Sequence, residues 1–592
     1  MSNSIEQIRH SFAHLLAAAV KRLYPEAKFG IGPVIENGFY YDFGNIEISE
    51  KDFPKIEKEM RKIAAQGHEF KKELWNADKA REHFNKEKQP YKLELITELS
   101  GSDPDSSVGM VYTGDVFLDL CRGGHVENTK DLPLDGFKLT RVAGAYWRGN
   151  EKNPMLTRIY GVAFETHVEL DNYIKQQEEA QKRDHKKLGK ELGLFTFSDL
   201  VGPGLPLFTP RGAIIRNVLK NFVENLEREN GYQEVWIPHL AKPDLYKISG
   251  HLDKFKEDIF YVKGKENEFV LKPMNCPHHT QIYKSQMRSY RDLPIRYFET
   301  TTVYRDEQAG ELGGLTRVRS ITQDDGHCFL REDQIEQELE INLKIQRELA
   351  RAVELKDYWI RLSLRDEKNK NAYLGDDETW QKAQKEMEDL LKKQKIKYEP
   401  KKGEAAFYGP KMDFMARDSL GREWQFSTIQ LDFNMPARFN LEYVTEDGSK
   451  KTPIMMHRAF LGSIERFMAM LIEHYAGAFP MWLAPEQIWI VPVSEKFNKY
   501  AGEVARVIAS GARMGEARQS DALSRIVIKS ENETLGKKIR EGQLQKIPYI
   551  IVVGEKEEKS KKISVRHRVK GDLGLSTVKK FTEDVKIELN NL

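Results

Sequence analysis

The stretch YRDEQAGELGGLTRVRSITQDDGH, residues 304–327, carries the strongest local signal in the chain, because its arginines gather around a glycine-containing turn. We expect one strand to end at Arg305, a loop to follow, and a second strand to carry Arg317 and Arg319. Arginine is always charged and grips phosphate with two parallel donors. From this stretch alone a solvated hairpin with surface charges is the favoured interpretation, and a phosphate-binding hairpin is the alternative.

A second segment, far downstream in the sequence, favours the interpretation that the arginines bind a nucleotide. Residues 458–478 are expected to form a helix, and its start, LGSIERF, offers Gly462 and Ser463 for close backbone approach and Arg466 on the first turns. The chain contains no GxxxxGK[ST] and no strand-led GxGxxG. A phosphate-binding loop at a helix N-terminus is therefore not predicted.

These segments resemble the class II aminoacyl-tRNA synthetases. FETTTVYRDE followed by TRVRSITQDDGH is similar to their motif 2, HRAFLGSIERF to motif 3, and NGYQEVWIP, which ends at Pro238, to the dimer-forming motif 1. Five further segments resemble the threonyl-tRNA synthetases in particular: KPMNCPHH, TQDDGH, FYGPKMDF, WQFSTIQLDF and MMHRAFLGS. HIGH and KMSKS, the signatures of the other synthetase class, are absent.

The resemblance implies ATP-dependent attachment of threonine to its tRNA through a threonyl-adenylate, with magnesium accompanying the nucleotide. The attacking carboxylate is already ionised at neutral pH, so positioning and charge stabilisation are the main tasks of the protein. The resemblance places Arg305 on the α-phosphate, Glu307 on the adenine amino group and Arg317 on the terminal phosphates. Gln323 belongs to the same predicted ATP site, and Arg466 would stack on adenine or bind phosphate.

Cys276, His327 and His457 lie too far apart for any local metal motif, and from the residues alone a buried thiol with two satisfied histidines is the favoured explanation. The resemblance puts all three at zinc-ligand positions, with one zinc per subunit. One Cys and two His leave a coordination position for the substrate. A zinc that binds the amino group and hydroxyl of threonine would reject valine, which an apolar pocket discriminates poorly.

The resemblance also implies a substrate pocket beside the zinc. Its expected lining residues are Tyr408, Gln425, Thr428, Gln430 and Asp325. Lys411 lies beside this pocket in the predicted catalytic set, with Arg305 and Arg466. Tyr408 would fit a plain core position as well. Cys328 should face away from His327 if the segment is a strand, and is assigned to the core.

Serine also carries a hydroxyl, and one missing methyl gives only about 10–200-fold discrimination, so a correction step is expected. His10 and His14 are spaced i, i+4 on one predicted helix, and DLCRGGH supplies Asp119, Cys121 and His125. HxxxH with CxxxH is compatible with a four-ligand metal site. The resemblance implies a metal-free site that hydrolyses mischarged seryl-tRNA, with two further lining residues, Tyr40 and Lys92.

The expected organisation is multidomain, α+β and α/β. An α+β editing domain over 1–170 precedes an exposed linker helix over 171–192. A class II catalytic domain with an antiparallel sheet follows over 193–484, and an α/β anticodon-binding domain with a largely parallel sheet over 485–592. The small ubiquitin-like domain that most family members carry first is expected to be missing, because HxxxH begins at residue 10.

The last region resembles the anticodon-binding domain most clearly over ENETLGKKIREGQLQKIPYIIVVGEKE, residues 531–557. It holds 21 Lys and Arg against 15 Asp and Glu, while the whole chain has a net charge of only +2. This excess is compatible with contact to a polyanion, but many globular domains carry a similar excess without a nucleic-acid partner. Asn532, Glu557 and Arg566 match anticodon-reading positions, whereas residues 513–530 depart from the usual family strand.

The composition of the 592-residue chain, 40% hydrophobic and 31% charged, is typical of a multidomain globular protein. No run of eighteen apolar residues and no secretory signal occurs, and three cysteines favour a reducing compartment, so a cytoplasmic homodimer without membrane contact is expected. Two other functions remain open. One is a synthetase-like paralogue that binds RNA or amino acid without charging; the other is a zinc hydrolase built on His10, His14, Cys121 and His125.

Overall fold

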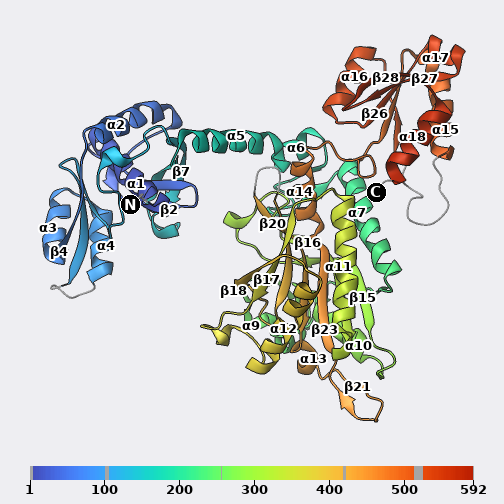
Figure 1. Ribbon diagram of the computed structural model, residues 1–592, viewed down its shortest axis with the longest axis horizontal. Helices are drawn as coiled ribbons and strands as arrows, with labels where there is room; N and C mark the ends of the chain where they lie inside the picture. The colour runs from blue at the N-terminus through green and yellow to red at the C-terminus, as the bar shows by residue number, and fades with distance from the viewer. Residues whose placement is uncertain (1–3, 101–105, 255, 418–421, 512–524, 591–592) are drawn as a thin grey trace. The chain divides into compact units, whose positions relative to one another are not determined.

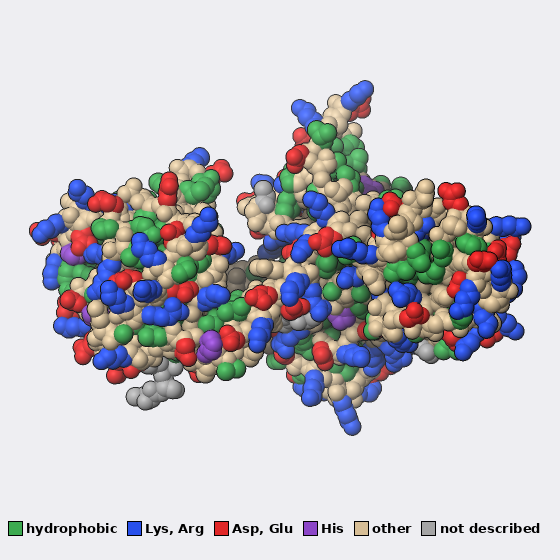
Figure 2. Space-filling model, turned by 90° about the horizontal axis from the view of Figure 1, so that it is seen from above, with side chains coloured by type: hydrophobic (Ala, Val, Ile, Leu, Met, Phe, Trp, Pro, Cys, Tyr) green, Lys and Arg blue, Asp and Glu red, His purple; other side chains and the backbone are tan. Residues whose placement is uncertain are grey.

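The computed structural model describes residues 4–100, 106–254, 256–417, 422–511 and 525–590 (Figure 1). The chain forms two compact units, Met1–Glu178 and Glu179–Leu592. Charged side chains of both signs are intermingled over most of the face in Figure 2, in keeping with the nearly balanced net charge. No helix in the described ranges is long and apolar enough to cross a membrane.

The first unit begins with helix α1 (Ile5–Leu23), as its apolar periodicity predicts. Ser4 caps this helix by accepting a hydrogen bond from the backbone N–H of Gln7. The buried stripe, which includes Phe12 and Leu16, packs against an antiparallel sheet of order β1-β3-β8-β7, with β2 paired to β3. The elements of this layer are α1, β1 (Lys28–Phe29), β2 (Val34–Ile35), β3 (Gly38–Gly44), α2 (Phe53–Ala65), β7 (Phe137–Tyr146) and β8 (Met155–Ala163).

A smaller antiparallel sheet, β4-β5-β6, completes this unit, and α3 and α4 pack against it (Figure 1). Its elements are β4 (Phe70–Asn76), α3 (Ala77–Lys86), α4 (Pro90–Ser100), β5 (Ser107–Thr113) and β6 (Phe117–Leu120). Strand β6 contacts α1 and ends one residue before Cys121, so it delivers the DLCRGGH segment to the helix that carries His10 and His14. The predicted α+β class is confirmed for this unit.

The predicted single linker helix is wrong in one respect, because the structure has two helices, α5 (His167–Arg183) and α6 (His185–Glu191). Asp184 separates them by adopting a non-helical conformation and capping α6 through the backbone N–H groups of Lys186 and Lys187. Helix α6 is also not fully exposed. His185 is buried and its Nδ1 lies 2.8 Å from Oε1 of Glu473.

The second unit is built on an eight-stranded sheet of order β11-β15-β16-β23-β20-β19-β17-β18, antiparallel except for the two outermost pairs. Its strands are β11 (Gln233–Glu234), β15 (Ile295–Tyr304), β16 (Ser320–Leu330), β17 (Tyr358–Leu364), β18 (Tyr398–Lys402), β19 (Lys411–Arg417), β20 (Glu423–Asp432) and β23 (Ile454–Ser463). Helices α7 (Pro210–Glu229), α11 (Ile335–Ala352) and α14 (Ile464–His474) pack against one face, shown for α7 and α11 in Figure 1. The antiparallel catalytic sheet is therefore confirmed.

Shorter elements surround this sheet. They are β9 (Phe195–Thr196), β10 (Leu207–Phe208), β12 (Leu240–Ala241), α8 (Pro243–Ser249), α9 (His251–Lys254), β13 (Tyr261–Lys263), β14 (Glu268–Leu271), α10 (Cys276–Lys284), α12 (Asp377–Lys393), α13 (Met435–Arg438), β21 (Tyr443–Val444) and β22 (Lys450–Lys451).

Two local expectations fail around the sheet. The helix predicted over 458–478 begins only at Ile464, because residues 454–463 pair with β16 and β20 and Ser463 then caps α14. Arg317 and Arg319 lie in the loop before β16 and not on a strand. Arg319 donates its backbone N–H to the carbonyl of Gly204, so this loop packs against the segment that precedes α7.

The C-terminal region has a five-stranded sheet of order β25-β24-β26-β27-β28. The expected largely parallel sheet is wrong: β24 pairs in parallel with β25 and β26, but β26, β27 and β28 are antiparallel. Short connections after β26 and β27 reverse the chain, and β28 is a glycine-rich edge strand with no apolar run to reveal it. The elements are β24 (Ile488–Pro492), α15 (Asn498–Gly511), β25 (Ile526–Ile528), α16 (Leu535–Leu544), β26 (Tyr549–Val553), α17 (Glu555–Ser560), β27 (Lys562–His567), β28 (Gly571–Thr577) and α18 (Val578–Asn590). Most of the departing segment 513–530 lies outside the described residues.

Candidate functional site

Three residues that are distant in sequence converge on the face of the large sheet opposite to α7, α11 and α14. Cys276 is the first residue of α10, and His327 on β16 is directly opposite His457 on β23. One possible ligand atom from each lies within 4.8 Å of the others, and all three side chains are buried. Cys328 points to the opposite face, where its Sγ lies 3.4 Å from Oε2 of Glu338, as strand alternation predicts.

A buried network on the helix-covered face fixes the register that brings the two histidines together. Arg458, only 1% exposed, forms an ion pair with Glu227 of α7 and donates to the carbonyl of Asp324. The Asp324 carboxylate accepts the backbone N–H of Phe460 at 2.7 Å. Gly326 lies under Arg458, where an added Cβ would come 2.1 Å from the guanidinium carbon, so this close contact requires glycine.

One ring nitrogen of each candidate ligand histidine has a side-chain partner within hydrogen-bonding distance. Nε2 of His457 lies 3.1 Å from Oδ2 of Asp432, whose Oδ1 accepts two backbone N–H groups at the start of α13. Nδ1 of His327 lies 2.7 Å from Nδ1 of His279. Such outer partners fix the tautomer and orientation of metal-binding histidines. Asp432 and His279 were not predicted, although both lie inside segments that carry the family resemblance.

Burial opposes the charged forms of two of the candidate ligands, Cys276 and His327. It raises the pKa of the Cys276 thiol well above its ordinary value and lowers the pKa of His327 well below its own. A bound cation would compensate the thiolate that such burial opposes. One Cys and two His are also a donor set that suits zinc.

Two of the predicted substrate-pocket residues, Gln425 and Thr428, meet through a carboxylate that sequence analysis missed. Asp413 on β19, 2% exposed, accepts from Gln425 Nε2 at 2.8 Å and from Thr428 Oγ1 at 3.0 Å through Oδ1. Its Oδ2 lies 2.7 Å from Lys411 Nζ and accepts from Ser363 Oγ at 2.8 Å. Alternation along β19 puts Asp413 on the same face as Lys411, which was the available signal.

Tyr408 lies directly against the candidate metal ligands. Its ring stacks on His457 with centroids 4.9 Å apart, and its hydroxyl donates to Oε1 of Gln430 at 2.5 Å. Asp325 lies on the same face as His327, and its Oδ2 accepts from Asn275 Nδ2 at 2.9 Å. Tyr408 is therefore buried as a core residue would be, and also lines the site.

Three predicted nucleotide-binding arginines gather beside this pocket. Arg305 follows β15 directly, and burial lowers its pKa. Burial also lowers the pKa of Arg466, and the positive charges of Arg305 and Arg317 lower it further. Burying several cations close together is unfavourable unless an anion balances their charge. This arrangement therefore favours an anionic ligand. Arg317 Nε donates to Oε2 of Glu307 at 2.7 Å, so two predicted ATP contacts are paired with each other here.

The geometry of the site leaves room for a ligand. A cavity of 350 Å³ lies beside Arg305 and Tyr408. Its other lining residues are His251, Lys254, Met274, Ala372, Tyr373, Ala405, Ala406 and Phe407. Gln323 lies further along β16, opposite Thr301 on β15 and Ser463 on β23.

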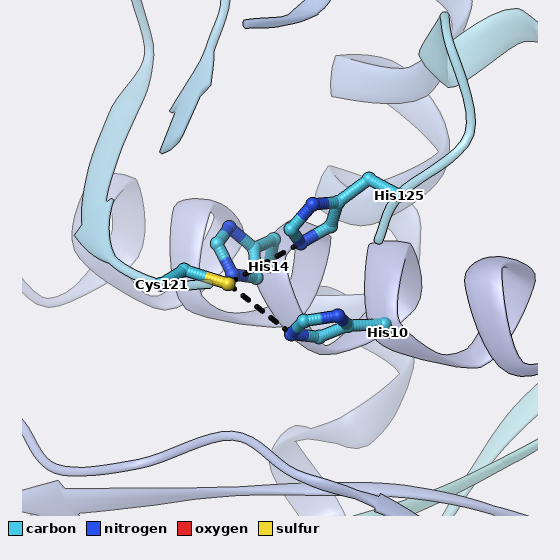
Figure 3. A group of neighbouring side chains, drawn as sticks. All are labelled: His10, His14, Cys121 and His125. Carbon is cyan, nitrogen blue, oxygen red and sulfur yellow. Dashed lines mark hydrogen bonds between the residues drawn. The ribbon is translucent and has the colours of Figure 1, made fainter. Parts of the chain in front are cut away.

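The first unit contains a second cluster, which the i, i+4 spacing and the DLCRGGH segment predicted together (Figure 3). Sγ of Cys121 lies 3.4 Å from Nε2 of His10 and 3.9 Å from Nε2 of His125. The rings of His10 and His125 stack at 4.1 Å, and that of His14 meets His125 edge-on at 4.3 Å. One possible ligand atom from each of the four residues lies within 4.8 Å of the others.

Burial sets the protonation of this cluster. It lowers the pKa of His125 to about 2, with help from the two neighbouring histidines, and raises the pKa of Cys121 to about 11. The cluster therefore presents neutral imidazoles and a neutral thiol at pH 7. Such groups can accept or relay protons from water, and can also bind a soft cation.

A buried ion pair lies next to this cluster. Lys92 is paired with Asp119, and Asp119 Oδ2 accepts from the hydroxyl of Tyr41 at 2.6 Å. Nε2 of His14 lies 3.9 Å from the same carboxylate oxygen. Asp119 thus links the predicted Lys92 to the histidine cluster.

The prediction for Tyr40 is wrong by one residue. Successive side chains of β3 point to opposite faces, and Tyr41 rather than Tyr40 faces Asp119. Tyr40 packs instead against Tyr160 and the guanidinium of Arg158, which lies 3.9 Å from its ring centre.

The three predicted anticodon residues have different settings. Both carboxylate oxygens of Glu557 serve the fold, since one accepts the backbone N–H of Gly554 and the other the hydroxyl of Ser564. Asn532 is exposed before α16, and Arg566 on β27 lies 3.5 Å from Asp572.

Three family models match the chain. Residues 257–475 match the tRNA synthetase class II core domain (G, H, P, S and T), residues 487–587 the anticodon binding domain, and residues 108–160 the threonyl and alanyl tRNA synthetase second additional domain. The fold and the site therefore define a class II aminoacyl-tRNA synthetase.

Sequence relatives identify the family within this class. A protein of Gloeobacter violaceus named threonine--tRNA ligase is 49% identical over 582 residues, covering 97% of this chain and 90% of its own. One of Porphyromonas gingivalis with the same name is 46% identical, covering 98% and 87%. The chain belongs to the threonine--tRNA ligase family.

Solved structures agree with this assignment. The RNA binding domain of threonyl-tRNA synthetase from Cryptosporidium parvum is 36% identical with a TM-score of 0.63, and the match covers 68% of this chain and 98% of that one. The prolyl-tRNA synthetase of Giardia lamblia is 18% identical with a TM-score of 0.54, covering 70% and 81%, and shows a shared fold.

Proposed function

We propose that this chain attaches threonine to its tRNA through an ATP-derived threonyl-adenylate and hydrolyses mischarged seryl-tRNA. The observation that carries the proposal is the convergence of Cys276, His327 and His457 beside Tyr408. Family membership gives the substrate class, and the second cluster around His10 supports the correction step.

Zinc is the proposed metal, held by Cys276, His327 and His457. When bound, it supplies a Lewis acid that distinguishes a substrate with an amino group and a hydroxyl from one without the hydroxyl. The chain itself supplies the walls of the pocket. Asp413 holds Gln425 and Thr428 in place through two hydrogen bonds, and Tyr408 covers His457.

The proposed activation step joins the threonine carboxylate to the α-phosphate of ATP and releases pyrophosphate. Arg305 holds the α-phosphate, and Arg466 stacks on adenine or binds phosphate. Arg317 exchanges its present partner Glu307 for the terminal phosphates, which frees Glu307 for the adenine amino group. Magnesium accompanies the nucleotide. Gln323 and Asp325 complete the proposed set, with Lys411 held beside it by Asp413.

The proposed editing step is hydrolysis of the seryl ester at the cluster of Figure 3. His10 and His14 order the attacking water, and neutral imidazoles are suited to accept its proton. Cys121 and His125 position the ester. Lys92 neutralises Asp119, whose carboxylate orients Tyr41 and lies close to His14.

The remaining assignments are also proposals. The editing, catalytic and anticodon-binding domains are assigned to 1–170, 193–484 and 485–592, and Asn532, Glu557 and Arg566 to anticodon recognition. A homodimer through motif 1 is supported by the exposure of Trp236, at 76%, since exposed aromatic residues are typical of interfaces. A cytoplasmic location is supported by three cysteines without a disulfide.

Threonine-dependent ATP–pyrophosphate exchange, repeated with valine and serine, tests the proposal. We expect exchange with threonine and serine and very little with valine. Folded, zinc-loaded protein without threonine-dependent exchange would instead support a paralogue that binds without charging. Metal analysis of the full chain in which Cys276 is replaced separates editing from a zinc hydrolase, because a second zinc at the His10 cluster would remain in the hydrolase.

A further inference from the structure

The imidazole of His279 lies directly behind one of the proposed zinc ligands. Its Nδ1 is 2.7 Å from Nδ1 of His327, and the two rings meet edge-on with centroids 4.7 Å apart. His279 is fully buried. We propose that His279 is a positioning residue, which accepts the Nδ1–H of His327 and thereby keeps Nε2 of His327 unprotonated for zinc. This inference rests on the proposed zinc site.

The direction of this hydrogen bond follows from the proposed zinc site together with the proton inventory of imidazole, since Nε2 of His327 lies 3.6 Å from Oδ1 of Asp325 and could otherwise carry the proton. A neutral ring carries one N–H and one acceptor nitrogen. If His327 donates through Nδ1, its Nε2 keeps a lone pair. If His279 donates instead, the proton of His327 moves to Nε2, and neither nitrogen of His327 is left for a metal. Only the first arrangement is compatible with zinc binding.

The first arrangement is also the costlier one for His279. It places the remaining proton of His279 on Nε2, and no described residue offers this nitrogen a hydrogen-bond partner. A buried N–H without a partner destabilises a fold and requires an explanation. The need to accept from His327 with the opposite nitrogen provides one.

Local sequence produces this contact. Cys276 and His279 are spaced i, i+3 on α10, so one turn of helix carries both the proposed thiolate ligand and the support for His327. His278 points elsewhere, with its Nδ1 3.5 Å from the hydroxyl of Tyr246. The sequence KPMNCPHH thus contains two adjacent histidines in different settings.

The groups that hydrogen-bond the two ligand histidines also differ in charge. His457 is supported by the carboxylate of Asp432, which raises the basicity of a ligand histidine. His327 is supported by a neutral imidazole, which raises the basicity of the ligand histidine less than a carboxylate does. A zinc held by these residues would keep more of its positive charge for the substrate than one whose ligand histidines were both supported by carboxylates.

Three full-length variants test the proposal: His279→Asn, His279→Gln and His279→Leu. Asparagine places its amide oxygen near the position of Nδ1, whereas glutamine reaches the position of Nε2 and leucine has no acceptor. Zinc affinity is measured on metal-free protein by competition with a chromophoric chelator, with His278→Asn as the matched control. We expect His279→Leu and His279→Gln to bind zinc about 10–100-fold more weakly, and His279→Asn and the control to remain near wild type.

Two results would overturn the inference: wild-type zinc affinity in His279→Leu, or equal weakening in His279→Asn and His279→Gln. If His279→Leu does not fold, the Asn and Gln pair decides alone. Failure of the proposed function is distinguishable, because wild-type protein would then bind no stoichiometric zinc. The absorption spectrum of the cobalt-substituted protein adds a readout of ligand geometry, which we expect to change with Gln and not with Asn.

Discussion

Replacing Asp413 by asparagine should disturb both the stability of the catalytic unit and its grip on threonine. The carboxylate is buried and accepts from Gln425 and Thr428 through one oxygen and from Ser363 through the other, which also faces Lys411. Asparagine keeps the shape but turns one acceptor into a donor. Whichever way the amide is turned, its NH2 faces a donor of the present arrangement, either the Gln425 amide nitrogen or the Lys411 ammonium.

The magnitude follows from the bond that must break. The two hydroxyls can rotate to accept, so one hydrogen bond to a charged group is lost, which costs about 1.5–3 kcal/mol. We therefore expect the free energy of unfolding in urea to fall by about 1.5–3 kcal/mol, and the threonine KM to rise because Gln425 and Thr428 lose their anchor. The KM for ATP should change little, since the arginines lie on other segments.

A matched control is Asp389→Asn, which makes the same replacement at an exposed position on α12. It should change the free energy of unfolding by less than about 0.5 kcal/mol. If Asp413→Asn behaves like this control and its threonine KM is unchanged, Asp413 does not organise the pocket and the reasoning is refuted.

Three other predictions follow from the two sites. Arg305→Ala should lower the rate of ATP–pyrophosphate exchange by about 10²–10³-fold at saturating substrates, as expected when a donor to developing charge is removed; a drop of less than tenfold would contradict its assigned role. Lys92→Met should abolish hydrolysis of seryl-tRNA while threonine-dependent exchange persists. It should also destabilise the first unit by about 3–5 kcal/mol, because Asp119 stays buried without its partner. Retained hydrolysis in a folded variant would contradict this prediction. Because the pKa of His125 is lowered to about 2, the unfolded chain binds more protons than the folded one between pH 6.5 and 2. The free energy of unfolding should therefore fall as pH falls through this window, by up to about 1.4 kcal/mol per pH unit. Thermal unfolding of wild type and His125→Asn at pH 7.5 and 5.5 checks this, and an equal pH dependence in both would contradict it.

Patterns with a short repeat could be interpreted correctly from sequence. The apolar stripe predicted α1, and the i, i+4 spacing placed His10 and His14 together on it. Strand alternation predicted that Cys328 faces away from His327. Each of these depends only on the geometry of one element.

Long-range convergence could be expected only through the family resemblance. Nothing local connects Cys276 with His457, because their proximity depends on strand register and on buried contacts such as that between Arg458 and Glu227. The choice of Tyr40 over Tyr41 shows the same limit on a smaller scale. Both residues lie on β3, and only the orientation of the whole strand decides which one faces Asp119.

The supporting residues were missed because their signal is tertiary. Asp413, Asp432 and His279 make hydrogen bonds to other site residues and have no spacing rule of their own. The mixed C-terminal sheet was missed because β28 is short of apolar residues and lies at an edge.

The most direct test of the central claim is an anomalous difference map, recorded at the zinc absorption edge, from crystals of the full chain grown with threonine. The account predicts one zinc peak in each subunit's catalytic unit, about 2.0–2.3 Å from Sγ of Cys276 and from one nitrogen each of His327 and His457. A map with no peak among these three side chains, from crystals that bind threonine in this pocket, would contradict it.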